Sequence, residues 1–181
     1  HSSFKDKVSM SNLCQEITLP TTPIQDIHDE QGEIALCILS AVNVGGLNDL
    51  SELENICDLS VRALEQIIDY QDYPVKAAEV STKKRRSLGI GYIGLAHYLA
   101  KNGVKYSDPK AWDLVDRLTE AFQYNLLRAS CNIAMEKGKC EGFERTKYAE
   151  GLLPIDHYKK EIDEIVPHKQ RMAWESLRKD I

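Results

Sequence analysis

Three side chains that could do chemistry together lie near the start of the sequence: Asn12, Cys14 and Glu16. In an extended backbone, residues two apart share one face, so these three would point the same way while Leu13 and Ile17 point the other way. An amide, a thiol and a carboxylate would then meet in one small pocket. The same spacing also fits a surface strand with a polar outer face and an incidental cysteine.

The neighbours of Cys14 limit the chemistry open to it. A carboxylate two residues from a thiol disfavours the thiolate, because like charges oppose ionisation. A thiolate nucleophile needs instead a nearby histidine, a cation or a helix N-terminus. No histidine lies near Cys14 in the sequence, although His28 could approach it in space. The surroundings therefore favour a neutral-thiol or radical role over that of a protease nucleophile.

The remaining cysteines are of two kinds. The five cysteines, an odd number, include no Cys-x-x-Cys pair and have no His-x-x-x-His partner, which argues against a zinc site. We therefore expect no metal to be bound by this chain. Cys57 and Cys131 lie inside helical patterns and are expected to be small buried core residues. Cys37 does not fit that pattern, and Cys140 is left as a packing residue or an exposed thiol.

The composition of the 181 residues is that of one ordinary globular domain, with 43% hydrophobic and 28% charged residues. The net charge of −5 argues against a nucleic-acid binder, and the run Lys83-Lys84-Arg85-Arg86 is the one basic exception. No apolar run approaches the roughly 20 residues of a membrane span, and the first thirty residues lack the plan of a signal peptide. We expect a soluble, cytoplasmic protein with no membrane partner.

Most of the scaffold that would position these residues is predicted to be helical. Ser51-x-x-Glu54 is a capping box that opens a helix to Tyr70. Asp108-Pro109 opens the longest helix, which ends at Gly138. Its apolar face comprises Trp112, Val115, Leu118, Phe122, Leu126, Ala129 and Ile133. Shorter helices are expected over residues 94–102, 155–165 and 168–179, and short strands over 13–19, 34–44 and 87–93.

The motif Gly89-Ile90-Gly91-Tyr92-Ile93-Gly94 matches the Gly-x-Gly-x-x-Gly pattern of dinucleotide-binding folds. Its context is wrong for that function. The basic run precedes it instead of an apolar strand, and no second strand follows to deliver an acidic residue. We therefore interpret these glycines as a tight strand-to-helix junction with close packing, and not as part of a Rossmann dehydrogenase.

The two ends of the sequence favour a segment of a longer polypeptide. The sequence begins with His1 and stops within the amphipathic pattern Met172, Trp174, Leu177, although a trimmed or tagged protein would look the same. We expect one segment, residues 1–181, of a longer or split subunit.

Several motifs in this order resemble one enzyme family. Residues 11–17 (Ser-Asn-Leu-Cys-Gln-Glu-Ile) and 33–45 (Glu-Ile-Ala-Leu-Cys-Ile-Leu-Ser-Ala-Val-Asn-Val-Gly) resemble the finger-loop region of the large (α) subunit of aerobic class I ribonucleotide reductases. The similarity continues through residues 69–74 (Asp-Tyr-Gln-Asp-Tyr-Pro), 86–91 (Arg-Ser-Leu-Gly-Ile-Gly) and 153–156 (Leu-Pro-Ile-Asp), so it covers essentially the whole chain.

The resemblance implies radical-based reduction of ribonucleoside diphosphates to deoxyribonucleoside diphosphates. Cys14 matches the cysteine that becomes a thiyl radical and abstracts the 3′ hydrogen of the ribose. Glu16 matches the general base for the 3′ hydroxyl, and Asn12 matches the asparagine that hydrogen-bonds the ribose. The backbone from Asn12 to Glu16, including Leu13 and Gln15, would line the substrate. Cys37 matches one member of the redox-active pair that supplies two electrons as the 2′ hydroxyl leaves.

The resemblance also implies a fold and a set of partners. The fold class is α/β, mostly helical, as part of a ten-stranded α/β barrel with the active-site cysteine on a central loop. The partners would be the remaining α segments, a radical-generating β subunit and thioredoxin or glutaredoxin. The parent enzyme implies ATP or dNTP effectors and a metal-radical cofactor in the β subunit, with no cofactor bound by this segment.

This chain lacks some of the family's parts. No cysteine precedes Cys14, so the usual partner of Cys37 must come from elsewhere. The phosphate-binding loop, the radical-transfer tyrosines and the C-terminal cysteine pair are also missing, so the segment alone is expected to be inactive. The alternative is a non-catalytic assembly piece that completes a split reductase barrel.

Overall fold

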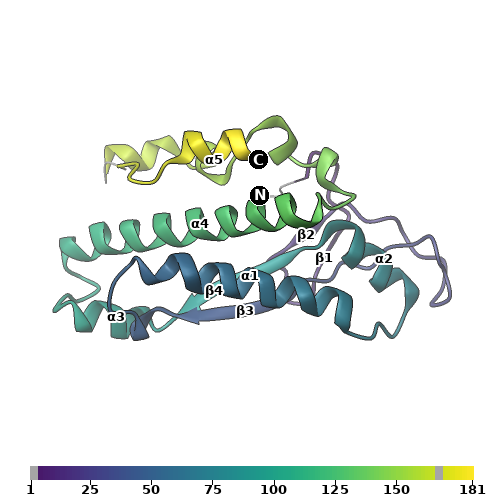
Figure 1. Cartoon of the computed structure of the whole chain (residues 1–181), viewed down its shortest axis with the longest axis horizontal. Coiled ribbons are helices and arrows are strands. Elements are labelled where there is room, and N and C mark those ends of the chain that lie inside the picture. The colour runs from purple at the N-terminus through teal and green to yellow at the C-terminus, as the bar shows by residue number, and fades with distance from the viewer. Residues whose placement is uncertain (1–3, 166–168) are drawn as a thin grey trace.

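Two long helices packed on a small sheet form the centre of the molecule. The structure is a computed structural model that describes residues 4–165 and 169–181. Helix α1 (Glu52–Tyr70) and helix α4 (Pro109–Lys137) lie side by side above strands β3 (Ile38–Asn43) and β4 (Leu88–Ile93) (Figure 1). Leucines with no exposed surface lie on both helices, which places the core between helices and sheet.

The two central strands are parallel and in register from Ile38 opposite Leu88 to Asn43 opposite Ile93. Parallel neighbours need a crossover connection. Here α1 and α2 (Lys76–Arg85) supply it, and α3 (Leu95–Lys101) follows β4. The main core cluster is made of Val42, Val44, Leu47, Leu53, Cys57, Tyr98, Leu99, Ala111, Leu118, Ala121 and Phe122.

The first fifty residues contain little regular structure. Strands β1 (Met10–Ser11) and β2 (Thr18–Leu19) form a short antiparallel hairpin. The segment from Thr22 to Cys37 contains no strand or helix before β3 begins. This hairpin lies behind β3 and β4 in the view of Figure 1.

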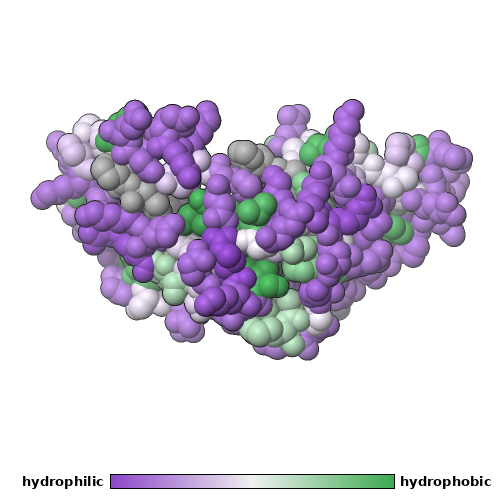
Figure 2. Space-filling view, turned by 90° about the horizontal axis from the view of Figure 1, so that it is seen from above, coloured by the Kyte–Doolittle hydropathy of each residue, from purple (hydrophilic) through white to green (hydrophobic). Residues whose placement is uncertain are grey.

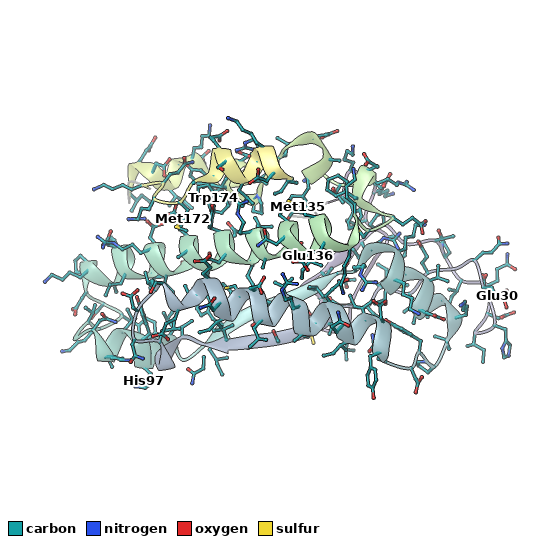
Figure 3. All side chains as sticks on the ribbon, viewed as in Figure 1. Glu30, His97, Met135, Glu136, Met172 and Trp174 are labelled. Atoms are coloured by element: carbon teal, nitrogen blue, oxygen red, sulfur yellow. The ribbon has the colours of Figure 1, made fainter. Side chains whose placement is uncertain are left out.

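The C-terminal part folds back along α4. It contains α5 (Trp174–Asp180), and the buried carboxylate of Glu120 on α4 holds the segment that leads into it. This carboxylate accepts hydrogen bonds from the Met172 backbone N–H at 3.0 Å and from Trp174 Nε1 at 3.0 Å. Figure 3 shows Trp174 and Met172 pointing toward α4. The short 3-10 helices are Val44–Gly46, Phe143–Arg145, Tyr148–Glu150, Pro154–His157 and Lys160–Glu164.

Most of the predicted helices and strands are confirmed. The helices expected over 51–70, 94–102 and 109–138 correspond to α1, α3 and α4, and the strands expected over 34–44 and 87–93 correspond to β3 and β4. The capping box does not form, because the Ser51 side chain makes no capping hydrogen bond. The expected burial of Trp112 is also wrong, since this side chain lies in the first turn of α4 and is 53% exposed.

Two other expectations were wrong, and one helix was not predicted. Residues 155–165 form short 3-10 helices and not one α-helix. The last helix begins at Trp174, and the expected start at His168 lies outside the described residues. The helix α2 was missed because its sequence, Lys-Ala-Ala-Glu-Val-Ser-Thr-Lys-Lys-Arg, has almost no apolar periodicity.

The surface on the α5 side is largely hydrophilic, with apolar groups gathered near its middle (Figure 2). Among the described residues, no helix is long and apolar enough to cross a membrane.

Candidate active site

A tight loop between β1 and β2 carries the residues singled out by the sequence. Its ends are joined at Asn12, whose backbone N–H donates to the Ile17 carbonyl at 3.2 Å. The Asn12 side-chain oxygen in turn accepts the Ile17 backbone N–H at 3.0 Å. Gln15 closes the turn with a positive φ of 65° and donates its N–H to the Asn12 carbonyl at 3.0 Å. The loop is therefore held by its own backbone and by one buried asparagine.

The extended conformation expected for residues 13–19 is wrong. Residues 13–15 form a turn, and only Thr18 and Leu19 are in a strand. Leu13, expected to anchor the opposite face, is 95% exposed. Gln15 and Cys14 are exposed as well. A seven-residue alternation does not distinguish a strand from a hairpin loop, because residues two apart also come together across a tight turn.

The loop nevertheless brings Asn12 and Glu16 together, and Cys37, the residue directly before β3, joins them. The Asn12 amide donates to the Glu16 carboxylate and, at 3.0 Å, to Cys37 Sγ. The Cys37 thiol donates to Glu16 Oε1 at 3.3 Å. An amide, a thiol and a carboxylate therefore form a closed triangle, with the exposed thiol of Cys14 on the same turn.

These contacts set the protonation of the cluster. The pKa of Glu16 lies below its ordinary value because its own backbone N–H, and then Asn12 and Cys37, hydrogen-bond the carboxylate. Burial, followed by the hydrogen bond to the Glu16 carboxylate, raises the pKa of Cys37 to about 12. At neutral pH the cluster thus holds a neutral thiol against a carboxylate. The Glu16 carboxylate therefore disfavours the thiolate of Cys37.

The other three cysteines lie away from this cluster. Cys57 is fully buried in the main core, and burial raises the pKa of its thiol to about 12. Cys131 is buried in the cluster below α5, where its thiol donates to the Asp180 carbonyl at 3.2 Å. The prediction that both are core residues is confirmed. Cys140 is half-buried, and among the described residues no group of three or more His, Cys, Asp or Glu side chains could hold a metal ion.

The basic run at the end of α2 is paired with carboxylates. Lys83 contacts Glu79 at 2.8 Å. Lys84 and Arg85 both contact Glu33, at 3.1 and 2.8 Å. Arg86 forms ion pairs with the side chains of Glu65 and Asp69. This arrangement neutralises the only basic cluster noted in the sequence.

The glycine motif lies at the junction between β4 and α3. Gly94 has a φ of +81°, and a Cβ there would lie 2.3 Å from Asn43 Oδ1 and 3.0 Å from the Gly45 backbone nitrogen. The strand-to-helix junction therefore requires glycine for both conformation and space. This confirms the packing interpretation of Gly94.

Comparison with known proteins decides the family. The whole chain, residues 1–181, matches the family model described as "Ribonucleotide reductase, barrel domain". The chain belongs to the ribonucleotide reductase family. It is 58% identical over 184 residues to the ribonucleoside-diphosphate reductase subunit alpha of Haemophilus influenzae. It is 51% identical over 184 residues to ribonucleoside-diphosphate reductase 1 subunit alpha of Escherichia coli.

The alignment to both bacterial relatives covers 100% of this chain and 24% of theirs. The corresponding subunit of Enterobacteria phage T4 is 41% identical over 179 residues, 98% of this chain and 23% of its own length. The chain thus spans about a quarter of the length of the curated relatives it matches. The resemblance to the large-subunit barrel and the mostly helical fold with small sheets are confirmed.

Sequence reasoning missed one buried ion pair of this segment. Glu33 is 2% exposed and Arg85 is 9% exposed, and they form an ion pair across 52 residues. Arg85 was noted only as part of a basic run. The one signal that could have revealed the pair is a glutamate directly before an apolar run that contains Cys37.

Proposed function

We propose that this chain supplies the catalytic loop and one redox cysteine for the radical-based reduction of ribonucleoside diphosphates to deoxyribonucleoside diphosphates. The observation that carries the proposal is the closed triangle of Asn12, Glu16 and Cys37, with Cys14 exposed on the same loop. The family membership and the names of the relatives support it.

Cys14, Glu16 and Asn12 are the proposed catalytic residues. Cys14, as a thiyl radical, takes the hydrogen atom from C3′ of the ribose and returns it at the end of the reaction. Glu16 accepts the proton of the 3′ hydroxyl, and its lowered pKa keeps it ionised for this task. Asn12 hydrogen-bonds the ribose and holds Glu16 in place. Leu13 and Gln15 contribute to substrate binding mainly through their backbone groups.

Cys37 is the proposed redox-active residue. When the 2′ hydroxyl accepts a proton and leaves as water, two electrons come from Cys37 and a second thiol, which close to a disulfide. We propose that this second thiol lies on another α segment. Thioredoxin or glutaredoxin then reduces the disulfide. Because its pKa is raised to about 12, Cys37 is neutral at physiological pH and can donate a proton as well as an electron.

The proposal includes the partners of the family. The remaining α segments would complete the barrel and provide the sites for ATP or dNTP effectors. A β subunit would generate the radical on its own metal cofactor. We place the protein in the cytoplasm, where reductant and nucleotides are available.

The test is a turnover assay with a ribonucleoside diphosphate, the remaining α segments, the β subunit and a dithiol. We expect deoxyribonucleotide formation with the native chain and none with Cys14→Ser. Cys140→Ser, which changes a half-buried cysteine outside the cluster, is the matched control and should keep full activity.

The assay also separates the proposal from the alternative. If the pieces assemble but turnover is the same with Cys14→Ser, the loop is scaffold and the chain is a non-catalytic assembly piece. Binding of Cys14→Ser to the other segments, measured by sedimentation, must match that of the native chain before loss of activity is assigned to chemistry.

A further inference from the structure

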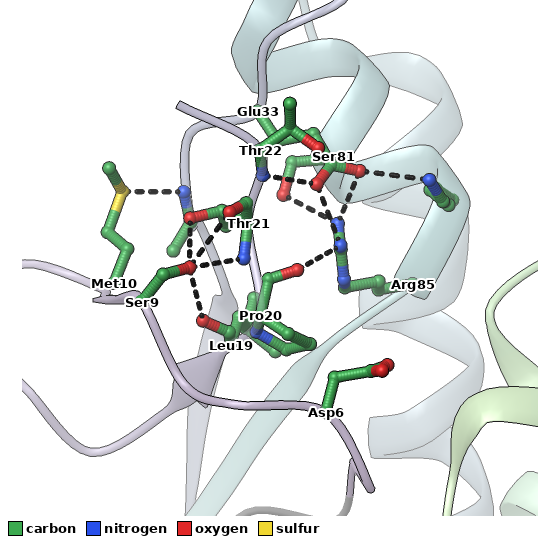
Figure 4. A network of polar contacts seen from close by, with 12 residues as sticks. Asp6, Ser9, Met10, Leu19, Pro20, Thr21, Thr22, Glu33, Ser81 and Arg85 are labelled. Atoms are coloured by element: carbon green, nitrogen blue, oxygen red, sulfur yellow. Dashed lines mark hydrogen bonds and ion pairs between the residues drawn. The ribbon is translucent and has the colours of Figure 1, made fainter. Parts of the chain in front are cut away.

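A buried ion pair joins the two stretches of chain that lead to the candidate site, one after Glu16 and one before Cys37. Arg85, in the last turn of α2, donates through Nη1 to Glu33 Oε1 at 2.9 Å and through Nη2 to Glu33 Oε2 at 2.8 Å. The two parallel bonds fix both the distance and the orientation of the partners. Figure 4 shows this bidentate pair within a network of polar contacts.

Both members of the pair also hold backbone groups. Arg85 Nη2 donates to the Pro20 carbonyl at 2.6 Å. The Glu33 carboxylate accepts the Thr22 backbone N–H at 2.8 Å, and the Glu33 backbone N–H donates to the Thr22 carbonyl at 2.9 Å. The pair therefore ties the chain that leaves β2 to the chain that approaches β3.

These two stretches carry the two halves of the cluster. Pro20 lies four residues after Glu16, and Glu33 lies four residues before Cys37. The two strands of the hairpin pair at two positions, and the hairpin is further tied to the chain before Cys37 by the Ala35 backbone N–H, which donates to Met10 Sδ at 3.2 Å. The apolar cluster beside it is also small, with Phe4, Leu19 and Ala35 as its buried members.

Charge explains why the pair is held so firmly. Burial tends to raise the pKa of Glu33, but hydrogen bonds from Arg85 and the Thr22 N–H outweigh it and lower the pKa to about 2. Glu33 is thus ionised throughout the physiological range. Removing Arg85 would leave this carboxylate buried with Lys84 as its remaining ionic partner, at 3.1 Å.

We propose that Glu33 and Arg85 are a positioning pair that sets the separation between Cys37 and the loop of Asn12, Cys14 and Glu16. The pair acts through the backbone at Pro20 and Thr22 and not by contact with substrate. Its consequence for turnover rests on the proposed reductase function, whereas its effect on the geometry of Cys37 does not.

The geometric part is tested by alkylation of the purified chain. Iodoacetamide is applied between pH 7 and 10, and the modification of each cysteine is followed by peptide mass spectrometry. In the native chain, Cys37 is expected to react slowly throughout this range. In Arg85→Met, exposure of Cys37 together with loss of its hydrogen bond to Glu16 should bring its half-reaction pH toward 9, with a rate at pH 8 at least about tenfold higher.

The matched control is Arg178→Met. Arg178 also binds a carboxylate through two nitrogens, on Asp156, and a backbone carbonyl, on Gly151, but in the C-terminal part of the chain. The Arg178→Met variant should leave the rate of Cys37 alkylation unchanged. Cys57 and Cys131 report unfolding, since both are buried away from the hairpin. If Arg85→Met releases all of these thiols, the same comparison is made with Arg85→Lys, which keeps the charge without the bidentate geometry.

The catalytic part is tested in the reconstituted reductase. We expect Arg85→Met to lower kcat at least about tenfold, with Arg85→Lys in between and Arg178→Met near the native value. Unchanged Cys37 reactivity in Arg85→Met, with Cys57 protected, would overturn the positioning role. If Cys37 reacts faster in Arg85→Met but kcat is unchanged, the ion pair has no role in turnover, and the proposed function stays intact. A native chain without turnover would overturn the proposed function, and the alkylation result would still decide the geometry.

Discussion

The helical layer of α1 and α4 and the N-terminal hairpin differ in what fills the space between their elements. The layer is packed with fully buried leucines, Leu53 and Leu118 among them, and with the uncharged thiol of Cys57. Around the hairpin the buried groups include Asn12, Thr21, Glu33 and Arg85, with few apolar partners. Burial of apolar surface stabilises the helical layer, whereas directional hydrogen bonds stabilise the hairpin.

The difference matters for a site in which several groups must meet within hydrogen-bond distance. Apolar packing is non-directional and tolerates small shifts. A buried polar network is strong only when every member is satisfied, and it then fixes its atoms closely. We infer that the helices provide most of the stability, whereas the hairpin network provides the geometry around Cys37.

The largest effect is expected from the helical layer. Leu118→Ala removes a side chain with no exposed surface and should lower the free energy of unfolding by about 3–5 kcal/mol. Urea unfolding followed by circular dichroism measures this. Leu59→Ala, on a 70% exposed side chain of α1, is the matched control and should change it by less than about 0.5 kcal/mol. Equal effects of the two variants would contradict the assignment of the core.

Acid should act on the hairpin and leave the helical layer less affected. The pKa of Glu33 is lowered from 4.5 to about 2, so its contribution to stability is complete above about pH 4.5 and is lost as the pH falls toward 2. For this side chain, 3% exposed, the contribution is on the order of 3 kcal/mol. Hydrogen exchange at pH 6, 4 and 3, corrected for intrinsic rates, should show that the Thr22 amide loses protection before the α4 amides. Simultaneous loss in both regions would mean that the two are one cooperative unit.

A third test concerns the junction that carries β4 into the helices. Gly94→Ala places a Cβ at a φ of +81° and 2.3 Å from Asn43 Oδ1, and we expect a loss of about 2–3 kcal/mol. Gly91→Ala is the control from the same motif, because nothing lies within 4 Å of a Cβ there. It should change the midpoint of thermal unfolding little. If Gly91→Ala proves as damaging as Gly94→Ala, packing does not explain the motif.

The same contrast explains how far the sequence predicted the structure. The helices α1 and α4 were predicted because their apolar residues repeat at helical spacing over many turns. The hairpin was mistaken for a strand, since the segment from Asn12 to Glu16 is too short for its period to be decisive. The turn depends on a positive φ at Gln15, and glutamine is not a residue type from which a positive φ would be predicted.

The sequence predicted which residues form the candidate site, but it did not predict the contacts between them. The motifs identified Asn12, Glu16 and Cys37, yet nothing local to the sequence indicates that an amide at position 12 meets a thiol 25 residues away. The pairing of Glu33 with Arg85 spans 52 residues and is equally hidden. Such contacts depend on tertiary packing, which composition and spacing do not encode.

The smallest effect is expected from the outer edge of the hairpin network. Ser9 Oγ accepts the Thr21 backbone N–H at 2.7 Å and donates to the Thr21 carbonyl at 2.8 Å. Ser9→Ala leaves these groups of the half-buried hairpin without that partner and should cost about 1–2 kcal/mol, seen as faster exchange of the Thr21 amide. Ser60→Ala is the control, because the Ser60 hydroxyl donates to the Ile56 carbonyl within α1 and alanine favours helix. If Ser9→Ala speeds exchange in α1 as much as at Thr21, the hairpin is not an independently held region and the comparison with the helical layer fails.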